Sequence, residues 1–296
     1  MKISQEELNE LINNPRHIIL RGLDLSEANL PGADLSQADL GDTNLSGANL
    51  SDANLNGADL IDTDLSKANL SRASLCDVDL RRANLSKAIL NKSDLSRANL
   101  MSADLVDVDL IGACLTGTRL SDTNLTKADL RGTDLSKSDL SRSRLIGANL
   151  NRVDLSGARL IRANLSEADL RDANLIGAFL GGADLSGAKL NNADLRWANL
   201  TKVNLSNADL SRAKLVDADL SEADLSEARL AKADLSDANL VNANLTKADL
   251  SEAKLIGADL SSAILRWANL AEAVYGTSTK FPAGFDPKAV GAIRNS

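Results

Sequence analysis

The chain has 296 residues, with 33 basic and 41 acidic side chains, and its formal charge of −8 disfavours a general nucleic-acid binder. Three Phe, two Trp and one Tyr are too few for an ordinary globular core, whereas 44% hydrophobic residues are too many for a disordered chain. Order must therefore come from how the residues are spaced.

The chain starts with a predicted short helix at residues 4–13. Ser4 and Glu7 fit a capping box, and an apolar stripe follows at Leu8, Leu11 and Ile12. We expect this helix to cover the first turn of the following domain, and we assign residues 1–19 to an N-terminal helical cap. No signal-peptide pattern and no stretch of about 18 apolar residues is found, so we expect neither secretion nor membrane insertion.

One period runs through residues 20–275. Leucine occupies every fifth position from Leu20 to Leu270, usually with Ala two residues before it and Asp or Asn one residue before it. The unit is Ala-(Asp/Asn)-Leu-x-x. Successive leucines would advance about 140° on an α-helix and would alternate faces on a straight strand, so neither element gives them a common side.

A coil satisfies the period. Ala and Leu, two residues apart, point the same way from a short extended segment, and the Asp or Asn between them points outward. The next two positions are rich in Ser, Gly, Lys, Arg and Asp, which suits turns. If the chain bends inward there, every Ala and Leu faces one axis. The spacing predicts a coil around a Leu and Ala interior, without fixing its number of sides.

These repeats resemble the pentapeptide-repeat family, as in Ala33-Asp34-Leu35-Ser36-Gln37 and Ala248-Asp249-Leu250-Ser251-Glu252. The resemblance covers roughly residues 20–275. It implies an all-β fold, a right-handed quadrilateral parallel β-helix with four repeats per coil, hence about 13 coils with short terminal caps.

The leucine rule fails at Tyr275, and we assign residues 276–296 to a C-terminal cap segment. Tyr275, Phe281 and Phe285 are candidates to plug the last coil. Asp286-Pro287 predicts a final helical turn that runs to about Ile293.

The residues indicate no enzyme. His17 is the only histidine, which excludes multi-histidine metal sites, and no phosphate-binding or dinucleotide-binding motif occurs. We expect no catalytic residue, no metal and no cofactor. Cys76 and Cys114 are predicted to be outward thiols on different coils, too far apart for a relaxed disulfide, and two cysteines favour a cytoplasmic protein.

Two features exceed the repeat pattern. The sequence Leu-Arg-Trp-Ala-Asn-Leu occurs at 195–200 and at 265–270, and exposed Trp beside Arg is typical of binding hot spots. The candidate partner-binding residues are Arg196, Trp197, Arg266 and Trp267. The two tryptophans are three and a half coils apart, so we expect them on opposite faces; the alternative is local duplication with each Trp covering its neighbours.

The second feature is charge banding. Acidic residues without a base run from Asp24 to Asp64, basic residues dominate at 67–97 and 119–162, and acidic residues return at 217–237. Such bands suit a protein partner of complementary charge, although a mixed surface without a partner explains them too.

Three functions remain open. The first is a non-catalytic protein-interaction or scaffold module that uses the outer faces, with a protein partner, no direct nucleic-acid binding and no membrane. The second, implied by relatives that bind DNA gyrase, is a DNA mimic; the basic bands, and leucine where those relatives often have Phe, count against it. The third is a structural spacer without a ligand. Neither the partner nor the oligomeric state follows from the sequence.

Overall fold

A computed structural model describes residues 4–12 and 18–295. The chain forms two compact units, Met1–Asn149 and Leu150–Ser296, each described by itself. The named elements are short: helix α1 at Gln5–Ile12, strands β1 at Val274–Tyr275 and β2 at Ile293–Arg294, and the 3-10 helix η1 at Lys288–Val290. No helix of the described residues is long and apolar enough to cross a bilayer.

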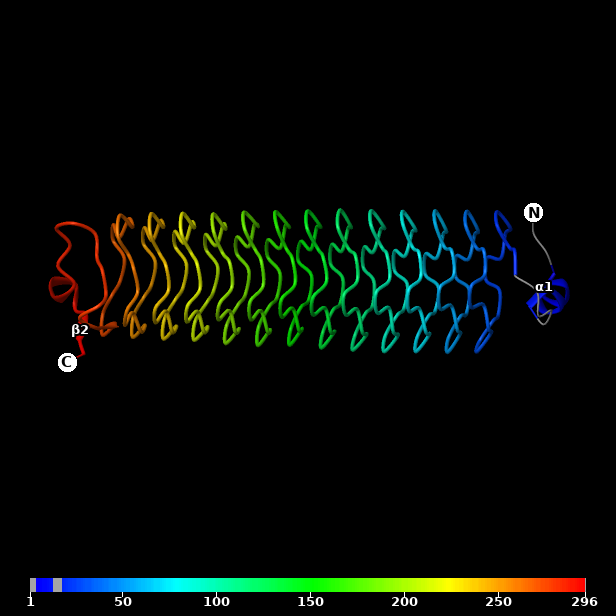
Figure 1. Cartoon of the computed structure of the whole chain (residues 1–296), viewed down its shortest axis with the longest axis horizontal. Coiled ribbons are helices and arrows are strands. Elements are labelled where there is room, and N and C mark those ends of the chain that lie inside the picture. Colours follow the sequence, from blue (N-terminus) through cyan, green and yellow to red (C-terminus); the bar gives the residue numbers. More distant parts are fainter. Residues whose placement is uncertain (1–3, 13–17, 296) are drawn as a thin grey trace. The chain divides into compact units, whose positions relative to one another are not determined.

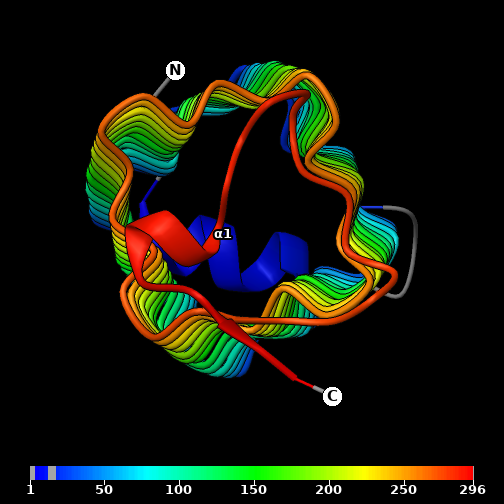
Figure 2. The same cartoon turned by 90° about the vertical axis from the view of Figure 1, so that its left-hand side faces the viewer.

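Within each unit the chain winds in similar coils, and each coil pairs in parallel with the next (Figure 1). The residue before each leucine bridges the residue twenty positions later, as in Asp39↔Asp59 and Phe179↔Asn199. Twenty residues hold four pentapeptides, so each coil has four short strands and four corners. The end-on view of the second unit shows these corners lying one behind another (Figure 2). The total of about 13 coils stays a prediction, because the two units are described separately.

Each corner is a turn closed by a backbone hydrogen bond. The amide of the third residue after the leucine donates to that leucine's carbonyl, as in Ala48 to Leu45 at 3.0 Å. The second residue after the leucine has a positive φ, near 60° at Glu27 and 64° at Gly177, which is the conformation that a type II turn requires. Most of these corners carry residues other than glycine, so their left-handed backbone is imposed by the stacked coils.

The interior consists of the leucines and the small residues two positions before them. Leu35 to Leu260 at every fifth position are buried, as are most of the alanines. In place of Ala, four valines lie at this position, at 78, 108, 153 and 203, and are also buried. The predicted Leu and Ala interior is confirmed.

Helix α1 covers the first coil. The capping box is confirmed: the Glu7 carboxylate accepts from the Ser4 amide at 2.8 Å, and the Ser4 hydroxyl accepts from the Glu7 amide at 3.2 Å. Leu8 is buried, but Leu11 is exposed, so the predicted apolar stripe contributes less than expected; the side chain of Ile12 is outside the described part.

Gln5 closes the open edge of that coil. Its side-chain amide donates to the Asn29 carbonyl at 3.2 Å and accepts from the Asn29 amide at 3.1 Å. In later coils the equivalent amide and carbonyl bond to the backbone of the preceding coil, as the Asn49 amide donates to the Ala28 carbonyl at 2.9 Å, so Gln5 takes the place of that backbone. Such cover protects the sheet edge from pairing with another chain.

At the other end, the expected helical turn forms with Pro287 at its start, but its predicted end near Ile293 is wrong. The 3-10 helix ends at Val290, where Gly291 turns the chain with φ 86°, and Ile293 and Arg294 form β2, which pairs with β1. Residues 293–294 form a strand rather than a continuation of the helix because one edge of β1 would otherwise be unpaired. Tyr275 is buried and packs edge-on against Phe281 at 5.4 Å, and Phe281 stacks on Phe285 at 5.5 Å, so the aromatic cap is confirmed.

Candidate functional site

The interior offers no site for chemistry in the described residues. Every buried side-chain nitrogen or oxygen there has a hydrogen-bond partner. The buried hydroxyls at the small interior position bond to leucine carbonyls, as Thr63 does to the Leu40 carbonyl at 2.9 Å and Ser93 to the Leu90 carbonyl at 2.6 Å. Functional side chains must therefore lie outside.

The frequent Asp and Asn residues build the corners. The side-chain oxygen of Asp64 accepts from the Ser66 amide at 2.9 Å, and Asn84 donates to Asp64 at 3.0 Å from the next coil. This two-residue bond is an Asx turn, repeated along both units. The outward orientation was predicted, but the turn bond was not. Because these carboxylates accept hydrogen bonds from backbone amides, fewer of them are available for acid–base chemistry.

Arginines neutralise carboxylates in two recurrent ways. At the corners, Arg72 forms a bidentate pair with Asp52 one coil earlier, at 2.7 and 2.6 Å; the same pairing joins Arg82 to Asp62, Arg97 to Asp77 and Arg142 to Asp122. Hydrogen bonding from Arg72 holds the pKa of Asp52 below its ordinary value. Arg72 and Arg82 lie in the first basic band and Asp52 and Asp62 in the first acidic band, so these two pairs partly cancel the charges of the two bands.

The second way lies within one repeat, in the sequence Asp-Leu-Arg. Arg81 pairs with Asp79 at 2.7 Å, and the same geometry recurs at Arg131, Arg171 and Arg196. Burial acts to raise the pKa of Asp194, but the hydrogen bonds from Arg196 and the charges of Arg196 and Lys214 together outweigh it, and the pKa falls below its ordinary value. These arginines fasten turns.

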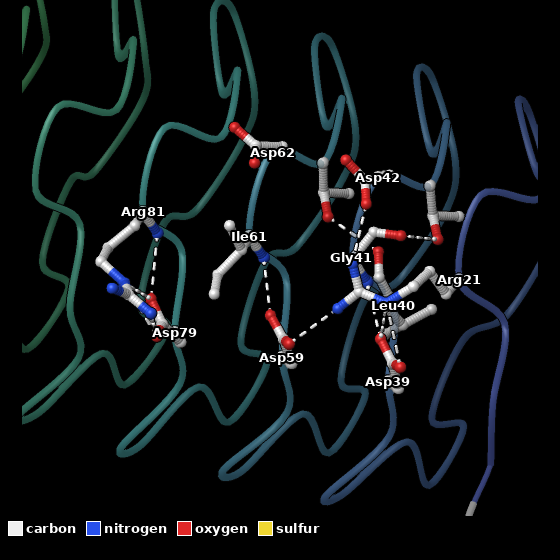
Figure 3. A network of polar contacts seen from close by, with 12 residues as sticks. Arg21, Asp39, Leu40, Gly41, Asp42, Asp59, Ile61, Asp62, Asp79 and Arg81 are labelled. Carbon is white, nitrogen blue, oxygen red and sulfur yellow. Dashed lines mark hydrogen bonds and ion pairs between the residues drawn. The ribbon is translucent and has the colours of Figure 1, made fainter.

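Arg21 shows how far such pairing extends. Its guanidinium contacts Asp39 and Asp42 on the next coil and Asp59 on the coil after it, at 3.0, 2.7 and 2.9 Å, and so joins three successive coils (Figure 3). Hydrogen bonding to Asp39 raises the pKa of Arg21. Three carboxylates around one arginine form a closed polar network at the first coils, next to the α1 cap.

The second basic stretch is different. In the described residues, no carboxylate pairs with five of its arginines: Arg119, Arg144, Arg152, Arg159 and Arg162. Arg119 and Arg144 belong to the first unit and the other three to the second. Positive charge that the chain leaves unpaired is available to a partner.

Trp197 lies at a corner with φ 58° and is 59% exposed. Its indole Nε1 donates to Asp217 at 3.1 Å in the next coil. The Arg196 guanidinium lies 5.6 Å from the indole centroid and is clamped by Asp194 at 2.8 Å. Of this predicted pair, Trp197 is therefore the accessible member.

Trp267 is at another corner, with φ 59° and 65% exposure. The Arg266 guanidinium lies 3.7 Å from the indole centroid and pairs with no carboxylate of the described residues. Trp197 and Trp267 are 70 residues apart, three and a half periods of the twenty-residue register, so the second unit carries them on opposite corners. The structure does not bring the two predicted pairs together.

Sequence reasoning missed Phe179, which is 45% exposed in a position otherwise held mostly by Asp or Asn. Its bridge partner Asn199 is two residues from Trp197. The signal was present in the sequence: with twenty residues per coil, a separation of 18 residues places two side chains on neighbouring coils of the same side.

The remaining candidates from the sequence are His17 and the two cysteines. His17 lies outside the described residues. Cys76 and Cys114 are free and half-buried, and burial raises the pKa of the Cys76 thiol. The part of the chain that the structure describes contains no cluster of three His, Cys, Asp or Glu residues able to hold a metal ion. One depression of about 320 Å³ occurs in the second unit, lined by polar residues such as Asn191, Arg212 and Lys232.

These features define a parallel β-solenoid with four pentapeptides per coil. A sequence profile of pentapeptide repeats matches nearly the whole repeat region, at residues 16–47, 43–82, 79–117, 103–142, 138–175, 168–207, 178–215, 204–240 and 233–271. The chain belongs to the pentapeptide-repeat family, whose fold is a right-handed quadrilateral β-helix.

Solved structures include three relevant relatives. HetL, a pentapeptide-repeat protein involved in heterocyst differentiation regulation in the cyanobacterium Nostoc sp. strain PCC 7120, is 36% identical over 93% of this chain and 97% of its own, with a TM-score of 0.30. Rfr23 from the cyanobacterium Cyanothece 51142 is 40% identical over 33% of this chain and 63% of its own, with a TM-score of 0.24. QnrB1, a plasmid-mediated fluoroquinolone resistance protein, is 19% identical over 69% of this chain and 88% of its own, with a TM-score of 0.42. No curated protein sequence matches the chain.

Proposed function

We propose that this chain is a non-catalytic protein-interaction or scaffold module, and that its outer faces bind one or more protein partners. The observation that carries the proposal is the pair of exposed tryptophans at left-handed corners, Trp197 and Trp267. At the other non-glycine corners of the described residues the same positive φ is held by a polar or charged residue, so two exposed indoles at this position are exceptional. Exposed Trp with Arg beside it is the composition of binding hot spots.

The rest of the surface supports the same function. Inward positions are nearly invariant in type, whereas outward positions hold every exposed aromatic side chain and all unpaired arginines of the described residues. Solenoids use such surfaces to bind partners along several repeats. The relative HetL is involved in the regulation of heterocyst differentiation, which agrees with an interaction function but does not identify a partner of this chain.

The DNA-mimic function has less support. A mimic presents continuous negative charge, whereas Arg119 and Arg144 in the first unit, and Arg152, Arg159 and Arg162 in the second, interrupt it. A gyrase supercoiling assay separates the two functions: the proposal predicts no inhibition and no drug protection at micromolar protein, and either effect would favour the mimic.

The proposal is tested by capture from a lysate of the source organism. The baits are the native chain and a variant whose exposed corner residues are permuted among corners, with Leu, Ala, Asp and Asn at their original positions. Circular dichroism checks that both fold alike. Proteins retained by the native surface alone are expected; equal retention by both baits favours a spacer without a ligand.

A further inference from the structure

Three successive coils of the second unit present one surface without a carboxylate. Its residues are 156–162, 176–182 and 196–202, which occupy the same positions in each coil because the register is twenty residues. We call this surface the aromatic–arginine face. The next coil, at 216–222, carries Asp217, Asp219 and Glu222, so the face ends at an acidic border.

Two of the three most exposed aromatic side chains lie on this face. Phe179 and Trp197 are 45% and 59% exposed. Arg159 bridges Phe179 from one side and Asn199 bridges it from the other. Trp197 is one coil and two residues from Phe179, a Cα separation of about 8 Å for strands 4.8 Å apart with about 3.3 Å per residue. The two rings are close enough to contact the same peptide segment.

Glycines at the neighbouring corners leave the Phe179 ring accessible. Gly157 and Gly177 form one corner beside Phe179, and Gly181 and Gly182 form the other. A Cβ atom at Gly177 would meet nothing within 4 Å, which shows the empty space around that corner. Gly157, Gly177 and Gly182 put no side chain at the corners beside Phe179, and the Arg162 side chain of the preceding coil lies beside Gly182, with its Cγ 3.7 Å from where a Cβ would be. Ile161 and Ile176 lie half-buried at the same corners and add apolar surface.

The aromatic–arginine face is positively charged, and some of its basic side chains form no ion pair. Arg196 is clamped by Asp194 and Lys202 pairs with Glu222 at 3.4 Å. Arg159 and Arg162 are exposed and have no carboxylate partner in the described part of the second unit. An acidic partner would gain two arginines without breaking an ion pair of this chain.

We propose that the aromatic–arginine face binds an extended, acidic segment of a protein partner, with apolar side chains on Phe179 and Trp197 and carboxylates on Arg159 and Arg162. This inference rests on the proposed interaction function and names its partner class. A flat surface with two anchors fits an extended peptide better than a small ligand, which needs a concave pocket. Single-stranded nucleic acid is less suited, because it needs a basic groove along its backbone, and the face ends at three carboxylates.

The test uses Trp197 as its own reporter. The chain has two tryptophans, so Trp267→Asn leaves Trp197 alone and Trp197→Asn leaves Trp267 alone. Asn is common at left-handed corners and keeps the fold. The probe is a synthetic 15-residue peptide of alternating Glu and Ser with a central Leu-Leu pair. Saturable change in the Trp197 emission is expected in the Trp267→Asn protein, with no change in the Trp197→Asn protein.

Side-chain variants then locate the contact in the Trp267→Asn protein. Phe179→Asn restores the residue type of the repeat, and Arg159→Glu with Arg162→Glu reverses the unpaired charge. Each is expected to weaken binding by about tenfold or more. The matched control is Lys189→Glu with Arg212→Glu, which changes the net charge equally at unpaired residues outside the face; its affinity should stay within about twofold.

Four results would overturn the proposal: no saturable response of Trp197, equal loss in the control variant, equal binding of a peptide with Ser in place of Leu-Leu, or binding of oligothymidylate in place of the peptide. Proteins captured by the native chain separate this inference from the proposed function. If they bind equally to the Phe179→Asn and the Arg159→Glu, Arg162→Glu variants, the interaction function stands and this face is not its site. If no protein is captured while the peptide binds, the face is confirmed as an acidic-peptide site and the lysate lacks the partner.

Discussion

The left-handed corner at Trp267 makes a quantitative prediction about stability. Trp267→Gly and Trp267→Ala both remove the indole and its contact with Arg266, so their difference isolates the backbone. An L-residue with positive φ costs about 1–2 kcal/mol relative to glycine, and glycine's larger freedom in the unfolded chain returns part of this. We expect the glycine variant to be more stable by about 1 kcal/mol, the reverse of the usual order in regular structure.

The assay is guanidinium denaturation followed by far-ultraviolet circular dichroism on both variants under one set of conditions. Gly177→Ala is the matched control, because φ is 64° there and an added Cβ meets nothing within 4 Å. The free energy of unfolding of Gly177→Ala should fall by about 1 kcal/mol, from the backbone conformation alone. Equal stability of Trp267→Gly and Trp267→Ala, or a more stable alanine variant, would refute the left-handed conformation of this corner.

Three further variants test other parts of the account. Gln5→Leu should accelerate hydrogen exchange of the Asn29 amide, which Gln5 protects; unchanged exchange by NMR would show that the cap does not pair this edge. Thr63→Val removes a buried hydrogen bond at a position where valine fits elsewhere, so thermal denaturation should show a loss of about 1 kcal/mol, and no loss would contradict the bond. Hydrogen bonding from Lys280 lowers the pKa of Asp259 to about 2. A lowered carboxylate pKa stabilises the fold fully above about pH 4, and this stabilisation is lost as pH falls through about 2. Asp259→Asn should therefore lower the free energy of unfolding by under about 1 kcal/mol at pH 6 and by clearly less at pH 2, and a pH-independent cost would contradict this.

The interior was predictable because one residue spacing determines it. Leucine at every fifth position has no common side on a helix or a straight strand, so a coil follows from geometry. The capping box at Ser4 and Glu7 was predictable for a similar reason, since its bonds are local. The turn to Ile293 was not, because Asp286-Pro287 suits a helix start and the unpaired edge of β1 is a tertiary effect.

The surface was less predictable, because it depends on which residues lie twenty positions apart. The charge bands in the sequence suggested a surface whose electrostatic potential alternates in sign. In the structure Arg72 pairs with Asp52 across the border between two bands, which reduces that alternation. Trp197 was identified from its composition alone. Its neighbour Phe179 becomes visible only when the chain is wrapped at twenty residues per coil, and so do the glycine corners that expose it.

The most direct test of the central claim, that the outer side chains bind a partner, uses the two tryptophans as probes. Protein labelled with 5-fluorotryptophan gives two fluorine resonances, which Trp197→Asn and Trp267→Asn assign. The spectrum is recorded in buffer and in a lysate of the source organism. The account predicts that the Trp197 resonance shifts or broadens in the lysate and recovers when excess unlabelled protein competes. Two resonances with unchanged positions and widths would contradict it.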